Sequence, residues 1–185
     1  DQAGLPNMKT STGTVVAADF DQDGDEDLFV GGRLSPQNYP QAPKSYLLEN
    51  RDGQFIDVTM EKAPNLDTYG MVTDAKWVDL DEDGWEDLVV VGEWLPISIF
   101  KNKQGFLEDI TTSAGLTESI GWWNTLSTAD LDQDGDMDFI VGNLGLNSPH
   151  KTSTERPFSL FLGDFDKNGK LDPILVHYLQ DRQVP

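Results

Sequence analysis

Residues 19–27 have the sequence DFDQDGDED, and the apolar run LFV follows directly at residues 28–30. Oxygen-bearing side chains stand at positions 1, 3, 5 and 9 of the nine-residue stretch, and Gly24 stands at position 6, where a tight loop must turn sharply. Alternate residues of such a loop can converge on one ion, and Ca²⁺ takes about six to eight oxygen ligands. The stretch therefore predicts a calcium-binding loop.

The same pattern, D-x-D-x-[DN]-G-x-x-D, recurs at residues 79–87, 130–138 and 164–172. One match could arise by chance, but four matches in 185 residues do not. The last loop has fewer carboxylates and contains Lys167 and Lys170, so we expect three calcium sites and a fourth, weaker one. The candidate side-chain ligands are Asp19, Asp21, Asp23 and Asp27; Asp79, Asp81, Asp83 and Asp87; Asp130, Asp132, Asp134 and Asp138; and Asp164, Asp166, Asn168 and Asp172.

The acidity of the chain is concentrated in these loops. The formal net charge is −20, from 33 acidic and 13 basic residues, and the loops hold 20 of those acidic residues but only two of the basic ones. Without cations this crowding of carboxylates would be self-repulsive, which favours metal binding over a generally acidic surface. The chain has no basic patch to meet phosphates, so we expect no nucleic-acid partner.

Composition limits the class of protein further. A length of 185 residues, 37% hydrophobic residues and 10% aromatic residues are typical of one folded domain. No apolar run of about 18 residues is present, so we expect no membrane span. Zero cysteines exclude disulfides and thiol chemistry. Weak calcium sites fill only outside the cytosol, so we expect an extracellular or cell-surface location, either secreted or associated with an outer membrane.

Short apolar runs before and after each loop predict strands. They lie at residues 14–18 and 28–30, 75–78 and 88–91, 126–129 and 139–141, and 158–162 and 174–176. A second hairpin follows twice, at residues 46–50 and 55–59 and at residues 97–101 and 106–111, with Asp-Gly or Gln-Gly at its turn. Four antiparallel strands per unit, at a spacing of about 40–60 residues, are typical of a β-propeller blade.

We therefore predict an all-β fold of four-stranded antiparallel blades, an incomplete β-propeller of about three blades. The single domain spans residues 1–185, with blades at about residues 13–60, 72–112 and 125–180. The fourth loop starts only 34 residues after the third, and we expect it to join strands 3 and 4 of the third blade. The alternative is that it begins a fourth blade. Propellers need about four to eight blades, so we expect this chain to be part of a longer protein.

An EF-hand is the main alternative reading of the loops, and it fails at position 12. An EF-hand loop needs an acidic residue there and a helix after it. The residues at position 12 are Val30, Val90, Val141 and Leu175.

These loops and strands resemble the FG-GAP/VCBS repeats of integrin α-chain propellers and of many secreted bacterial proteins. Residues 47–59 and 105–116 look like the cartilage acidic protein-like (ASPIC/UnbV-associated) branch, and residues 121–124 and 142–147 are similar to exported bacterial proteins. The resemblance implies structural calcium, an extracellular location and a role in binding or cell adhesion. It also implies that position 7 supplies a backbone carbonyl, which would add Asp25, Trp85, Asp136 and Lys170 to the ligands.

We expect a module that binds a protein or a glycan and contacts the remaining blades of a longer chain, and we expect no enzyme activity. A purely structural scaffold or spacer is the alternative, and part of a propeller-based enzyme is a more distant one. Trp122 and Trp123, with Trp94, could stack on sugar rings, but we expect them to pack in the core. His150 and His177 stand apart from any catalytic pattern.

Overall fold

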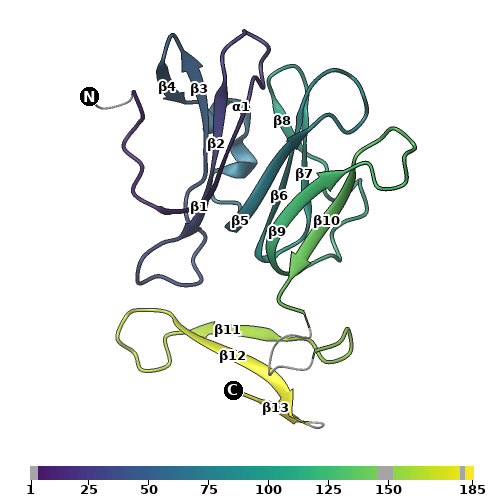
Figure 1. Cartoon of the computed structure of the whole chain (residues 1–185). Helices are drawn as coiled ribbons and strands as arrows, with labels where there is room; N and C mark the ends of the chain where they lie inside the picture. The colour runs from purple at the N-terminus through teal and green to yellow at the C-terminus, as the bar shows by residue number, and fades with distance from the viewer. Residues whose placement is uncertain (1–3, 146–151, 180–181) are drawn as a thin grey trace.

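The computed structural model describes residues 4–145, 152–179 and 182–185, and it is built from antiparallel strands (Figure 1). The first sheet is a meander of four strands that pair in chain order. These strands are β1 (Ser11–Ala18), β2 (Asp27–Leu34), β3 (Tyr46–Arg51) and β4 (Gln54–Asp57). A short helix, α1 (Thr59–Lys62), and a 3-10 turn, η1 (Pro64–Leu66), lead to the next sheet.

The second sheet repeats this meander. Its first four strands, again paired in chain order, are β5 (Met71–Val78), β6 (Asp87–Leu95), β7 (Ser98–Asn102) and β8 (Leu107–Asp109). The end of β6 also pairs with β9 (Gly121–Ala129), which pairs with β10 (Asp138–Asn143). The predicted all-β architecture of four-stranded antiparallel, propeller-like blades is thus confirmed for two consecutive units, and the assembly is not closed.

A separate sheet contains β11 (Ser159–Gly163), β12 (Asp172–Leu179) and β13 (Arg182–Val184). Figure 1 shows this sheet lying across one end of the other strands. Within the described ranges, β11 pairs with β12 and not with β10. The fourth loop lies between β11 and β12, and β12 also pairs with β13. The first loop has the same surroundings, since it lies between β1 and β2, and β2 also pairs with β3. The blade limits at residues 13–60, 72–112 and 125–180 remain predictions.

The core lies between the first and second sheets. Its largest fully buried side chains are Phe20, Phe29 and Phe100, and each such burial is worth about 1.5–3 kcal/mol. A second cluster around Val89 and Leu126 joins the opposite face of the second sheet to the β9–β10 hairpin. Strand β6 is therefore buried on both faces, which explains why residues 88–91 form an uninterrupted apolar run.

Two predicted strand ends are wrong. The strand predicted at residues 55–59 ends at Asp57, because the Asp57 carboxylate accepts hydrogen bonds from the Thr59 amide and hydroxyl, and α1 begins at Thr59. The strand predicted at residues 106–111 is confined to β8, where Thr111 makes the same amide contact with Asp109. An aspartate two residues before a threonine ends both strands.

Candidate metal centres

Each of the four loops closes a strand hairpin at the same point. Loop 1 spans residues 19–27, loop 2 residues 79–87, loop 3 residues 130–138 and loop 4 residues 164–172. Position 9 of every loop is the first residue of a strand and pairs with the residue just before position 1. The pairs are Asp27 with Ala18, Asp87 with Val78, Asp138 with Ala129, and Asp172 with Gly163. The strand ladder thus fixes position 9 next to position 1.

The carboxylate at position 1 organises the loop backbone. In loop 1 the two oxygens of Asp19 accept hydrogen bonds from the amides of Asp23 and Gly24, both at 3.0 Å. Loops 2 and 4 repeat these bonds at positions 5 and 6, whereas the donors in loop 3 are at positions 4 and 6. These amides hold each loop closed around the first carboxylate.

The backbone of every loop passes twice through the left-handed region. At position 4, φ lies between 57° at Glu82 and 65° at Gln133, and at position 6, φ lies between 83° at Gly169 and 103° at Gly135. Residues with a Cβ atom can adopt the φ seen at position 4, but they rarely adopt the larger φ seen at position 6, which explains the glycine there. The predicted sharp turn is confirmed in all four loops.

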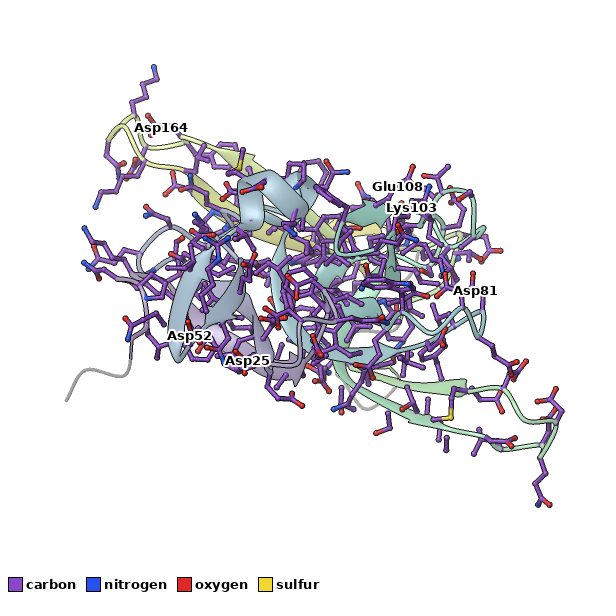
Figure 2. The ribbon with its side chains drawn as sticks, turned by 90° about the horizontal axis from the view of Figure 1, so that it is seen from above. Asp25, Asp52, Asp81, Lys103, Glu108 and Asp164 are labelled. Carbon is purple, nitrogen blue, oxygen red and sulfur yellow. The ribbon has the colours of Figure 1, made fainter. Side chains whose placement is uncertain are left out.

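The loops bring carboxylates together. In each loop, one oxygen from each of three carboxylates lies within 4.8 Å of the others. Loops 1, 3 and 4 do this with positions 1, 3 and 9, and loop 2 does it with positions 1, 3 and 5. The clustered residues are Asp19, Asp21 and Asp27; Asp79, Asp81 and Asp83; Asp130, Asp132 and Asp138; and Asp164, Asp166 and Asp172. Figure 2 shows Asp25, Asp81 and Asp164, from three of the loops, well apart from one another, so the centres are separate.

The other candidate ligands lie at positions 5 and 7. The side-chain oxygen of position 5 accepts a hydrogen bond from the amide of position 7 in every loop, for example from Asp25 to Asp23 at 3.0 Å and from Lys170 to Asn168 at 2.8 Å. This Asx turn holds the two positions together. The carbonyl ligation expected at Asp25, Trp85, Asp136 and Lys170 stays a prediction.

Loop 1 contains a buried oxygen atom that a cation would satisfy. Asp21 Oδ1 has no hydrogen-bond partner among the described residues. Burial raises the pKa of Asp21, and the charges of Asp23 and Glu49 raise it further. A buried polar atom without a partner is costly, and calcium prefers carboxylate oxygens. The residues of loop 1 therefore fit Ca²⁺.

Position 9 is the buried end of the site. Asp27 is fully buried, and it accepts hydrogen bonds from the amides of Phe20 at 3.2 Å and Asn50 at 2.7 Å. Burial nevertheless raises the pKa of Asp27 to about 7. Burial also raises the pKa of the equivalent Asp87. A bound divalent cation would favour the ionised form of both groups.

These two aspartates are held in place by two asparagines, Asn50 and Asn102, which were not predicted from the sequence. The backbone amides of Asn50 and Asn102 donate to position 9 of loops 1 and 2, at 2.7 Å in both cases. Each side-chain oxygen also accepts a hydrogen bond from a glycine amide three residues later, at 2.8 Å. The signal was present in the sequence as N-x-x-G, at residues 50–53 and 102–105.

Loops 1 and 2 are also joined to each other. Gln22 Nε2 donates to the carbonyl of Gly84 at 2.6 Å. Asn102 Nδ2 donates to the carbonyl of Phe20 in loop 1 at 2.8 Å and to that of Glu86 in loop 2 at 3.1 Å. Since Asn102 is 1% exposed, its side chain is a buried bridge between the two centres.

Loop 2 differs from loop 1 in having a lysine among its carboxylates. Lys101 Nζ forms ion pairs with Asp81, with Asp83 at 2.8 Å and with Asp87 at 3.6 Å. These contacts raise the pKa of Lys101 despite its burial and lower that of Asp83.

Trp94, Trp122 and Trp123 are all half-buried, and they lie in two different clusters. Trp123 packs against the Val89–Leu126 cluster, as predicted. Trp94, Trp122 and Phe158 have ring centroids 5.5–6.0 Å apart and line a cavity of about 410 Å³. His177 lies in β12, and His150 lies outside the described residues.

A comparison with known protein families identifies the repeats that contain the first three loops. In the described segments, no helix has the length and hydrophobicity needed to cross a membrane. A comparison with curated proteins gave no match. The FG-GAP-like repeat matches twice, at residues 19–90 and 79–141, and the two segments overlap at loop 2. Together they include loops 1 to 3 and more than half of the chain, whereas loop 4 lies beyond them. The chain therefore belongs to the FG-GAP-like repeat family.

Proposed function

We propose that this chain is an extracellular module of propeller-like blades that bind Ca²⁺ for structural purposes and present a surface to a protein or carbohydrate partner. The proposal includes an adhesive rather than an enzymatic role. Three sites, in loops 1 to 3, bind calcium more tightly than the fourth, in which Asn168, Lys167 and Lys170 reduce the negative charge.

The observation that carries the calcium proposal is the convergence of carboxylates in loop 1, where Asp21 Oδ1 is buried without a hydrogen-bond partner among the described residues. Three acidic side chains within 4.8 Å repel one another, and one of them, Asp27, is fully buried. A divalent cation offsets that repulsion, and its binding free energy adds to the free energy of unfolding. The extracellular location is supported by the FG-GAP-like repeat and by the calcium concentration that weak sites require.

Removal of calcium tests the proposal. One site that is saturated a hundredfold above its Kd contributes about 2.7 kcal/mol. For a domain of this length, about 1 kcal/mol changes Tm by about 2–4 °C. Excess chelator should therefore lower Tm by about 5–11 °C for each such site, and Mg²⁺ should restore it poorly, since Mg²⁺ demands a smaller octahedral site. A melting curve that does not change in chelator would contradict the proposal.

The partner proposal has its own test. Trp94 and Trp122 line the 410 Å³ cavity, and aromatic faces of this kind stack on sugar rings. A glycan array and a pull-down with the intact protein would distinguish carbohydrate from protein partners. The absence of a partner in both assays would favour the structural scaffold.

Exposed apolar side chains support the proposal that further blades complete the assembly. Ile140 on β10, Phe161 on β11 and Leu179 on β12 are 52%, 50% and 63% exposed. Blades of a propeller bury such side chains against their neighbours. A longer chain that includes adjoining repeats should be more stable than this segment alone.

A further inference from the structure

Glu49 and Lys101 occupy equivalent positions beside loops 1 and 2. Glu49 directly precedes Asn50 on β3, and Lys101 directly precedes Asn102 on β7. The two asparagines make the same amide hydrogen bond to position 9 of their loops, which fixes the correspondence. The same place beside the two centres thus carries opposite charges.

At loop 2 this side chain is directed into the carboxylates. Lys101 Nζ contacts Asp81 and Asp83 by hydrogen bonds and lies 3.6 Å from Asp87. The Lys101 side chain is only 14% exposed, so the ammonium group is held in the loop rather than extended into solvent. One ammonium therefore lies among the carboxylates at positions 3, 5 and 9, which are three of the four side-chain positions expected to bind calcium.

At loop 1 the arrangement is different. The Glu49 carboxylate forms an ion pair with Arg51, so this position supplies no cation to the loop. Lys62 also lies beside loop 1, with its Nζ 4.0 Å from Asp21 Oδ2 and 5.0 Å from the centre of the Phe106 ring. Asp21 Oδ1 remains without a partner among the described residues, whereas its counterpart Asp81 is paired.

We propose that Lys101 determines the calcium affinity of loop 2 by competing with the ion, so that loop 2 fills at a higher calcium concentration than loop 1. The inference rests on the proposed calcium function. Calcium and an ammonium group cannot occupy the same cluster of carboxylates, so binding at loop 2 must displace Lys101. Among the described residues, loop 1 has no such competitor in contact with three of its carboxylates, since Lys62 approaches only Asp21, at 4.0 Å.

The test compares Lys101→Met with Lys103→Met in the full chain. Lys103 lines the same surface hollow as Asp83 and Trp85, but it pairs with Glu108 and is 62% exposed. Figure 2 shows Lys103 and Glu108 next to each other. The two variants lose the same charge, and only Lys101→Met loses the contact with the loop. The assay follows Tb³⁺ luminescence excited through Trp85, which reports on loop 2. The Trp85→Phe variant, which should lose this signal, assigns it to loop 2. Displacement of Tb³⁺ by added Ca²⁺ then gives the calcium affinity of the loop.

Lys101→Met should tighten calcium binding at loop 2 about tenfold, which corresponds to about 1.4 kcal/mol. Lys103→Met should change it less than about threefold, and Lys101→Arg should keep the weak affinity of the unaltered protein. Lys101→Gln provides a second neutral variant if Lys101→Met unfolds. Equal affinities for the Lys101 and Lys103 variants would overturn the inference but leave the calcium function intact. If Ca²⁺ displaces Tb³⁺ from none of the variants and not from the unaltered protein, both the inference about Lys101 and the proposed calcium function are overturned.

Discussion

Replacing Asn102 with alanine should destabilise the protein more than the same change at Asn50. Both asparagines lie at the same position of their blades, and both keep their backbone amide bond to the position 9 carboxylate in the variants. They differ because Asn102 is 1% exposed and also reaches across to loop 1. The pair therefore isolates the bridge between the two centres.

The magnitude follows from the hydrogen bonds that are lost. Asn102→Ala removes the bonds to the carbonyls of Phe20 and Glu86 and the bond from the Gly105 amide. At a net value of about 0.5–1.5 kcal/mol each, the loss is about 1.5–4.5 kcal/mol, in the upper part of that range because Asn102 is buried. Of the described side-chain bonds, Asn50→Ala removes two, to the Glu26 carbonyl and from the Gly53 amide. At the same value per bond the loss is about 1–3 kcal/mol, and it should lie in the lower part of that range because both bonds are exposed.

Urea-induced unfolding in saturating calcium measures both losses. The free energy of unfolding should fall more for Asn102→Ala, and the calcium affinities of both loop 1 and loop 2 should fall in that variant. Asn50→Ala should affect loop 1 alone. If Asn50→Ala costs as much free energy as Asn102→Ala, the bridge between the loops contributes nothing and the reasoning is refuted.

Three further predictions concern pH, backbone strain and the independence of loop 3. In chelator, the raised pKa of Asp27 (about 7, against an ordinary 3.8) means that the folded protein holds this proton more tightly than the unfolded chain. The Asp27 contribution to the free energy of unfolding should therefore fall as pH rises from about 4 to about 7, and Asp27→Asn should remove this pH dependence. If Tm changes with pH equally steeply in the unaltered protein and in Asp27→Asn, measured by calorimetry, this prediction fails. Gly84→Ala should lower the free energy of unfolding by about 1–2 kcal/mol through backbone strain alone, because φ is 87° and the added Cβ would meet no neighbour, and it should also weaken calcium binding. Gly115→Ala (φ 75°) is the control: it should cost a similar amount but leave calcium binding unchanged in a parallel titration. Asp132→Ala should weaken calcium binding at loop 3 and leave it unchanged at loops 1 and 2, because the described hydrogen bonds between loops join only loops 1 and 2. Weaker calcium binding at all three loops in a titration would contradict this independence.

The sequence was sufficient for the features that depend on local chemistry. The D-x-D-x-[DN]-G-x-x-D pattern predicted the turn at Gly24 and its three counterparts, because the position 1 carboxylate and the glycine act within nine residues. The runs at residues 28–30 and 88–91 predicted the strands that leave loops 1 and 2. These features need no knowledge of distant partners.

Features that depend on strand register could not be predicted in this way. Glu49 and Lys101 are visible in the sequence, but their place beside position 9 follows only from the pairing of β3 with β2 and of β7 with β6. The bridge from Asn102 to Phe20 joins residues 82 positions apart and depends on how the first two sheets pack. Pairing of β6 with β9 at Glu93 and Trp122 likewise has no local signal.

Calorimetric titration of Ca²⁺ into chelator-stripped protein tests the central claim most directly. We expect Ca²⁺ to bind at the four loops, with the tightest site at loop 1, the weakest at loop 4 and little heat from Mg²⁺ at the same concentrations. A titration without calcium-specific binding, in protein shown to be folded, would contradict it.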